Sequence, residues 1–458
     1  MHQACRFAAD IYPIDDCVVA RVCCNELFEQ GSEMRRLIAP TIQAMQAVFA
    51  LIAIVIAPYP ACGYATDGAA DSTQSMFSFS GFGTLGVVHS NDHDADFTST
   101  IFEPNGAGYS HDWSPAVDSL IGAQVIANFT PRLSAMLQVI SQQNYDNTYT
   151  PHVEWANIKY ELTPEASIRV GRTVLASFLV SDTRNLGYAN PWVRPPVEVY
   201  SLVPIDSNDG IEASYRLHIG DLIQTFVGTY GATTSKQTTG TNADARRQWN
   251  ISDTLEYGAA TLRIAYQRAT LTLDGLDTFF GAFGHFGPQG VALESKYDPY
   301  RKPLEFVGIG ALYNPRDWFV TGEWGTSQFH SVIGESTAWY VSGGYRLAKF
   351  TPYLTYGALK ANSNTSDPGL NVSALVPYLA GPAMGLNAAL NAILGSIPVQ
   401  STTSAGVRWD FMKNVDLKLQ YDHTRLGEGS PGVLTNLQPG FERGGTVDLF
   451  SAAIDFLW

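Results

Sequence analysis

The side chains that could do chemistry in this sequence are charged groups at alternate positions of short apolar segments. In residues 260–273, Arg263 stands between Leu262 and Ile264. Successive side chains of a β-strand point to opposite faces, so this arginine would face away from its apolar neighbours. The same parity places further basic residues on that second face: Lys159, Arg169, Arg216, Arg346, Arg408 and Lys418. It also places five acidic residues there: Glu161, Glu212, Glu323, Asp410 and Asp416.

Fixed charges of both signs along one face of a sheet predict a wall that borders water. An arginine or lysine facing hydrocarbon would instead cost about 2–4 kcal/mol near the middle of a bilayer. Any one of these residues could be no more than a solvated wall charge. As a set they indicate a polar lumen of mixed charge.

Sequence patterns for catalysis or metal binding are weak. The nine histidines are scattered, and Gly-x-Ser-x-Gly and His-Glu-x-x-His do not occur. The stretch 92–96, Asp-His-Asp-Ala-Asp, could bind a hard cation through oxygen ligands, but an exposed acidic loop explains it as well. We therefore expect no catalytic residue, no metal and no cofactor. A catalytic site assembled only in space is the alternative.

The elements that must position the charged residues are alternating segments of about ten residues, which recur from Phe77 to the end of the chain. We count about sixteen. Tight turns such as Thr130-Pro131-Arg132 and Gly220-Asp221 join them in pairs, and we expect the intervening connections to run to tens of residues. One of these, 361–400, contains the apolar run 386–394, which predicts a helix over the mouth of the sheet structure. Charged residues are only 16% and aromatic residues 12%, which suits a sheet with one apolar and one wet face.

The last segment, 446–458, alternates up to its final residue. Phe456 and Trp458 share one face with Ile454, and Asp455 and Ser451 lie on the other. This pattern resembles the closing strand of a bacterial outer-membrane β-barrel, although most members of that family end in Phe. An edge strand of a soluble β-sandwich is the alternative.

Short connections that alternate with long ones extend the resemblance to the Gram-negative outer-membrane porin superfamily, and to its general porins of sixteen strands. The resemblance covers about residues 76–458 and rests on pattern rather than on a sharp motif. It implies an all-β fold, a transmembrane antiparallel β-barrel over 77–458 with short periplasmic turns and long extracellular loops. It also implies a homotrimer in the outer membrane, in contact with lipid and lipopolysaccharide.

The long connection 174–208 is the one that the resemblance places after the fifth strand. In general porins this loop folds into the barrel and narrows it against wall arginines. Here its charged candidates for a constriction are Asp182, Arg184, Arg194, Glu198 and Asp206. The Pro195-Pro196 pair cannot donate to a strand ladder, which favours a defined structure that is not a strand. An external loop over the mouth is the alternative.

The N-terminal part reads as a targeting segment. Met34-Arg35-Arg36, an apolar stretch from Ala47 and small residues before a cut after Ala65 predict a signal peptide at 34–65. We interpret 1–33 as a doubtful extension, with a mis-assigned start, and 66–76 as a short periplasmic lead-in. All five cysteines precede the predicted cut. Residues 1–65 carry four basic and six acidic side chains, so their removal changes the formal net charge from −15 to −13, which argues against nucleic acid as a partner.

These observations predict a passive diffusion channel for small hydrophilic solutes and ions, and not an enzyme. Selectivity would arise where the loop 174–208 meets the wall, with Arg169, Arg216 and Arg263 as the strongest candidates and a lean toward anions. The alternatives are a non-conducting outer-membrane barrel, either an adhesin or a lipid carrier, and an outer-membrane hydrolase.

Overall fold

The computed structural model describes residues 75–458, and the predicted extension 1–33, the predicted signal peptide 34–65 and most of the predicted lead-in 66–76 lie outside the described residues. Its sixteen long strands are β1 (Phe77–Ser90), β5 (Leu120–Thr130), β6 (Leu133–Gln142), β7 (His152–Glu161), β8 (Ala166–Val174), β9 (Ser207–Ile219), β10 (Leu222–Lys236), β11 (Asn242–Tyr257), β12 (Ala260–Leu273), β13 (Lys302–Tyr313), β14 (Trp318–Phe329), β15 (Gly334–Tyr345), β16 (Phe350–Ala361), β17 (Gln400–Met412), β18 (Val415–Leu426) and β19 (Thr446–Leu457). Three two-residue strands lie in the first long connection: β2 (Asp96–Phe97), β3 (Ala107–Gly108) and β4 (Trp113–Ser114). The helical elements are η2 (Ser181–Thr183), η3 (Gly187–Ala189), α3 (Val197–Tyr200), α4 (Asp277–Gly284), α5 (Gly287–Tyr297), η4 (Val372–Ala374) and α6 (Pro377–Leu394).

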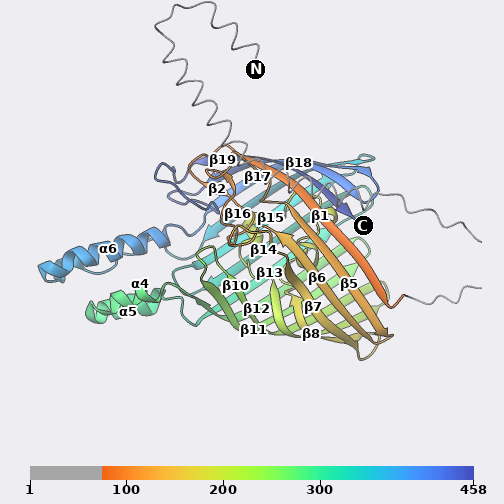
Figure 1. The fold of residues 1–458 in the computed structure, drawn as a ribbon, viewed down its shortest axis with the longest axis horizontal. Helices are drawn as coiled ribbons and strands as arrows, with labels where there is room; N and C mark the ends of the chain where they lie inside the picture. Colours follow the sequence, from red (N-terminus) through yellow and green to blue (C-terminus); the bar gives the residue numbers. More distant parts are fainter. Residues whose placement is uncertain (1–74) are drawn as a thin grey trace, which may run out of the picture. The chain divides into compact units, whose positions relative to one another are not determined.

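The long strands form one closed antiparallel barrel (Figure 1). Each strand pairs with its neighbours in chain order, and β1 pairs with both β5 and β19. The predicted all-β class and the barrel of about sixteen strands are therefore confirmed.

The seam between β1 and β19 depends on two small residues. Trp458 and Gly81 exchange backbone N–H···O hydrogen bonds of 3.0 Å, which completes the ladder at the last residue. A Cβ on Gly81 would lie 2.0 Å from the Trp458 ring, and one on Gly83 would lie 2.5 Å from the Phe456 ring. The rings of Trp458 and Phe456 thus pack on β1 at two glycines, where the side chain of any larger residue would clash with them.

All seven hairpin turns between consecutive long strands lie at one end of the barrel, together with the start of β1 and the end of β19. Gly220 and Gly258 have φ values of 62° and 57° in two-residue turns, the left-handed conformation that such hairpins require. At the other end the connections differ in length more than we predicted. The connections 143–151, 237–241 and 330–333 are short, so the expectation of tens of residues is wrong there. At 237–241 the reason is that β10 and β11 continue as wall where a loop was expected.

The helices of two long connections pack on each other rather than on the barrel wall. α4 and α5 follow β12, and α6 precedes β17. They share an apolar cluster that includes Phe280, Phe283, Leu390 and Leu394. In Figure 1 they extend side by side away from the barrel end, so the predicted helix does not cover the mouth.

The outward face of the strands is apolar. Ile251 and Ile264 are 58% and 47% exposed there, as strand parity predicts for Ile264. Aromatic rings gather near the short turns, for example Phe350 stacked on Trp409 with ring centroids 5.6 Å apart. Among residues 75–458, none of the helices combines the length and the apolar character needed to cross a membrane.

Candidate functional site

The connection between β8 and β9 crosses the interior of the barrel. We call residues 175–206 the inner loop. Trp192 Nε1 donates to Ser342 Oγ at 2.9 Å, and Lys418 Nζ donates to the Gly187 carbonyl at 2.7 Å. Ser177 Oγ donates to Gln267 Oε1 at 2.9 Å. The wall partners belong to β15, β18 and β12 and point inward, so the inner loop lies within the barrel.

The inner loop packs on β13–β16 through an apolar core. Phe178, Trp192, Val199 and Tyr200 are buried there against wall side chains that include Phe306. Glycines make room for this contact, because a Cβ on Gly310 would meet the Leu179 side chain at 2.6 Å. Dispersion and apolar burial therefore hold the loop on this side of the lumen.

Arg194 is the main charged anchor of the inner loop. Its Nε and Nη2 donate to the two carboxylate oxygens of Asp118 at 2.8 and 2.6 Å. Its Nη1 donates to Asp422 at 3.2 Å, and Nη2 also donates to Ser451 Oγ at 2.7 Å. Arg194, Asp118 and Asp422 side chains are all less than 10% exposed. Arg194 was predicted for the constriction, and the structure places it in a closed network that fixes the loop.

Glu198 and Tyr200 make further buried anchors. Glu198 accepts hydrogen bonds from Gln400 Nε2 at 2.7 Å and from the Thr402 hydroxyl. Tyr200 donates to Glu323 Oε1 at 2.7 Å, and Leu179 N donates to the other oxygen of Glu323 at 2.8 Å. The predicted constriction residue Glu198 is thus 2% exposed and faces the wall rather than open space.

Two of the predicted pore-lining cations also hold the inner loop. Lys418 is fully buried, with its Nζ 2.8 Å from Asp455 Oδ2 as well as bonded to the loop. Arg408 donates to the carbonyls of Tyr188 and Asn190 at 2.6 and 3.2 Å. Both point inward as their strand parity predicts, but only Arg408 reaches a chamber; Lys418 borders neither chamber described below.

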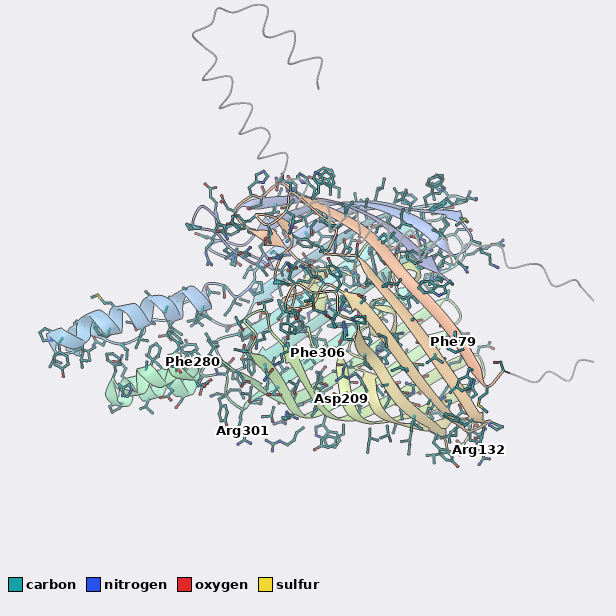
Figure 2. All side chains as sticks on the ribbon, viewed as in Figure 1. Phe79, Arg132, Asp209, Phe280, Arg301 and Phe306 are labelled. Carbon is teal, nitrogen blue, oxygen red and sulfur yellow. The ribbon has the colours of Figure 1, made fainter. Side chains whose placement is uncertain are left out.

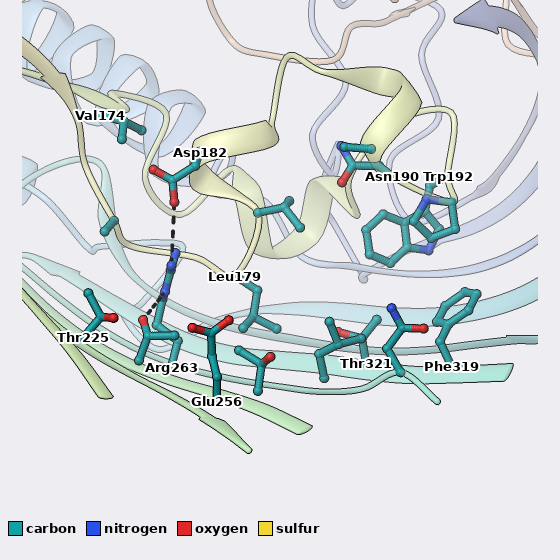
Figure 3. Close-up of a pocket in the computed structure, with 18 of the residues that line it drawn as sticks. Val174, Leu179, Asp182, Asn190, Trp192, Thr225, Glu256, Arg263, Phe319 and Thr321 are labelled. Carbon is teal, nitrogen blue, oxygen red and sulfur yellow. Dashed lines mark hydrogen bonds and ion pairs between the residues drawn. The ribbon is translucent and has the colours of Figure 1, made fainter. Parts of the chain in front are cut away.

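An inner chamber of about 780 Å³ lies between the inner loop and the turn-side parts of β8–β14, and residues of β16 and β17 such as Thr351 and Arg408 also line it (Figure 3). Arg263 reaches from the wall to the loop, with Nη2 3.6 Å from Asp182 and Nε donating to Thr254 Oγ1 at 3.0 Å. Arg169 Nη1 is 2.7 Å from Glu212 Oε1. Arg216 is exposed and makes no ion pair with any of residues 75–458. The ionisable residues of the lining are Arg169, Arg216, Arg263, Arg346, Arg408, Asp182, Glu212, Glu256 and Asp410.

The remaining predicted wall cations serve the turn end of the barrel. The guanidinium of Arg346 donates to the carbonyls of Pro315 and Trp318 and to Asn314 Oδ1, so it stabilises the turn between β13 and β14. Arg346 also borders the inner chamber. Lys159 Nζ lies 2.8 Å from Glu161 Oε1 and borders neither chamber.

An outer chamber of about 420 Å³ lies on the opposite side of the inner loop, toward the long connections. Arg184 and Asp206, both predicted for the constriction, face it and lie 3.6 Å apart. Partial burial, with Glu154 nearby, raises the pKa of Asp206. Burial also raises the pKa of Glu103, in the first long connection, to about 8. The outer chamber is therefore lined by ionisable groups of both signs.

Sequence reasoning missed the partners of the anchors. Asp422 shares the strand parity of Lys418, so its inward position could have been found. Asp118 lies in a connection without periodicity, and nothing in the sequence relates it to Arg194. Within residues 75–458, no group of three His, Cys, Asp or Glu side chains is arranged to hold a metal.

Comparison with known proteins agrees on the fold. No protein-family model matches the chain, and no curated protein matches it in sequence. Among solved structures, OmpF of Salmonella typhi in complex with daunomycin has a TM-score of 0.50 and 12% identity, covering 83% of this chain and 97% of that one. The outer-membrane channel DcaP of Acinetobacter baumannii has a TM-score of 0.49 and 12% identity, covering 84% and 99%. OmpT of Vibrio cholerae has 0.48 and 11%, covering 84% and 99%. At this identity the match to OmpF shows the fold, a closed barrel like that of Gram-negative outer-membrane porins.

Proposed function

We propose that the protein is a porin of a Gram-negative outer membrane, a passive diffusion channel for small hydrophilic solutes and ions. One observation carries this proposal: a closed barrel with an apolar outer face encloses two chambers lined by charged and hydroxyl-bearing side chains. An apolar exterior suits lipid, and a wet, charged interior suits the passage of hydrated solutes.

The barrel has the dimensions of a membrane span. Most strands have 10–16 residues, such as β13 with 12. A strand needs about 9–11 residues to cross hydrocarbon at a tilt near 45°. The aromatic rings at the turn end match an interfacial girdle, so we assign the short turns to the periplasmic side and the helices to the cell exterior.

Selectivity is assigned to the inner chamber, where the inner loop narrows the lumen. Arg169 and Arg263 each have an acidic partner, whereas Arg216 faces the space without one. Charges around a narrow pore lie closer to a permeating ion than the ~8 Å screening length at physiological salt, so they act on that ion. Charges on the outer loops are screened by salt and do not. This excess of basic groups favours anions over cations.

The rival functions have less support. A lipid carrier needs an apolar interior, and the chambers are charged. A serine hydrolase needs a nucleophile bonded to a base, and no serine–histidine hydrogen bond occurs among residues 75–458. An adhesin is the alternative that one observation favours, because α4–α6 form a separate projection.

Three further assignments complete the proposal. Residues 34–65 direct export and are removed, the channel assembles as a homotrimer, and outer-membrane lipid and lipopolysaccharide surround it. The exposed side chains of Arg246, Arg247 and Arg301 near the outer ends of β11–β13 suit contact with anionic headgroups (Figure 2 labels Arg301).

The test is purified, folded protein in a planar lipid bilayer. We expect stepwise conductance, with steps in groups of three if the trimer holds. Folded protein that stays silent at all voltages would transfer the assignment to the adhesin.

A further inference from the structure

The wall between the two chambers carries polar side chains with atoms that find no hydrogen-bond partner among residues 75–458. On β10, Thr225 and Val227 border the inner chamber and Thr233 borders the outer one. Thr229 lies between them on the same inward face and borders neither chamber. The strands β8, β9 and β11 also carry inward-facing residues in this gap between the two chambers. The residues in this gap, which we call the polar band, are Thr173, Asn208, Thr229, Gln248, Asn250 and Ser252.

These residues are contiguous across four strands. Thr173 is opposite Asn208, and Thr229 is opposite Asn250. The Asn208 side chain extends over Gly231, whose ladder partner is Gln248, since a Cβ on Gly231 would lie 2.5 Å from Asn208 Oδ1. The band is therefore continuous across β8–β11, in the part of the wall between the two chambers.

The polar band is buried and unsatisfied. Its six side chains are 0–3% exposed. Both amide atoms of Asn208 and Asn250, the hydroxyls of Thr173, Thr229 and Ser252, and Gln248 Oε1 have no hydrogen-bond partner among residues 75–458. Natural proteins satisfy nearly all such groups, because an unpaired buried amide or hydroxyl is costly. A row of them on one wall indicates a surface that is hydrated when the protein works.

The opposite wall provides the contrast. Ser342, at 1% exposure, bonds to Trp192 and Thr355, and Gln420 bonds to Val193 and Tyr353. Among residues 75–458, the inner loop thus hydrogen-bonds to polar side chains of β14–β19, such as Ser342, Gln420 and Glu323, but to none of the unpaired atoms of the polar band. Hydrogen bonds near the band occur at the two roots of the inner loop, the residues around Ser177 and around Ser207 at the start of β9. Ser177 donates to Gln267, the ladder partner of Asn250, and the Ser207 carbonyl accepts from Gln248 Nε2 at 3.2 Å.

We infer that the polar band is the hydrated floor of the passage between the two chambers, so that water and small hydrophilic solutes cross the level of the inner loop along β8–β11. The roots of the inner loop move off the band when the passage fills, while the loop remains anchored to β14–β19. This inference rests on the proposed channel function and specifies its path.

The first experiment introduces single cysteines, because every natural cysteine of the chain precedes residue 75. Asn250→Cys and a matched control, Ser342→Cys, are equally buried and inward facing. Each is recorded in a planar bilayer while a charged, water-soluble methanethiosulfonate is added. Asn250→Cys should lose conductance as the thiol is modified, and Ser342→Cys should keep its conductance.

The outcomes separate the two proposals. A parent protein that never conducts defeats the channel function itself. A conducting Asn250→Cys channel that the reagent leaves unchanged defeats the path along the polar band while the channel function stands. Modification of Ser342→Cys at the rate of Asn250→Cys would also defeat it, because the passage would then be on both sides of the loop.

A second variant covers the case in which the cysteine disturbs folding. Thr229→Val keeps the shape of the side chain and removes an unpaired hydroxyl. We expect a lower conductance, because the variant favours the state in which no water reaches the polar band. Resistance to heat should be unchanged or higher, because the variant no longer buries an unpaired hydroxyl. Thr355→Val, which removes the hydroxyl bonded to Ser342 at 2.7 Å, should lower heat resistance. A Thr229→Val channel that conducts like the parent would show that the band is only a packing feature and would overturn the inference.

Discussion

Removal of the Arg194 side chain should release the inner loop from the barrel wall. Arg194→Met keeps much of the aliphatic stem and deletes the guanidinium. Asp118 and Asp422 would then remain buried, each less than 10% exposed, without the cation between them. The loop must either keep two unpaired carboxylates in a dry site or move so that water reaches them.

The size of the effect follows from the burial of this network. Breaking a buried ion pair by removing one partner costs about 3–5 kcal/mol. At 1.4 kcal/mol for each factor of ten, the ratio of docked to undocked loop falls by roughly 10² to 10⁴. Arg184→Met is the matched control, because its ion pair with Asp206 is 3.6 Å long and Asp206 is 35% exposed. The guanidinium of Arg184 also lies over the Tyr200 ring, 5.7 Å from its centroid. Such a pair is worth about 0.2–1 kcal/mol.

Two measurements report on the loop. Hydrogen exchange of the amides in 175–206 should accelerate strongly in Arg194→Met and little in Arg184→Met, while the strand amides stay protected. In a planar bilayer, Arg194→Met should show larger and noisier steps. Adding Asp118→Asn and Asp422→Asn to Arg194→Met should restore part of the protection, since neutral amides are cheaper to bury than carboxylates.

Equal protection of 175–206 in Arg194→Met and Arg184→Met would show that Arg194 does not hold the inner loop on the wall. A triple variant less protected than Arg194→Met would show that the unpaired carboxylates are not the cause of the release.

Three other predictions follow from the same structure. Deletion of Leu457 and Trp458 should strongly reduce assembly into membranes, because it uncovers Gly81 and removes the last ladder pair; normal insertion of the truncated chain would contradict this. Arg169→Ala, Arg216→Ala and Arg263→Ala should each shift the reversal potential in a salt gradient toward cation permeability, and unchanged potentials in all three would place selectivity outside the inner chamber. For Glu103, burial raises the pKa from 4.5 to about 8, so its contribution to the order of the connection 91–119 is full below pH 4.5 and is lost as pH rises through about 8. Exchange protection there, corrected for the intrinsic rate, should fall over this range in the parent and stay flat in Glu103→Gln.

Most of the barrel could be predicted from local pattern, and the interior could not. Alternation with period two is a property of a few neighbouring residues, so it located sixteen strands and the inward position of Arg263. Turn residues such as Gly220 located the hairpins for the same reason. The path of the inner loop depends on contacts between residues far apart, such as Arg194 with Asp118 and Ser451, and no local pattern encodes those pairs. Charged residues of the wall also have two roles that the sequence pattern does not distinguish. Lys418 holds the inner loop, whereas Arg216 faces the inner chamber.

The projecting helices have a mechanical consequence for the rim of the barrel. α5 and the connection after β16 are joined by an apolar cluster, by Lys296 and Asp367 at 2.9 Å, and by Gln289 with the carbonyl of Gly369 at 3.2 Å. This junction links the outer ends of β12 and β17 across the four strands between them. It stiffens that sector of the rim, whereas the described residues form no such junction over the sector from β5 to β11. Either connection alone would leave an apolar face in water. Insertions and deletions in one of these two connections should therefore be accompanied, among relatives of this protein, by matching changes in the other.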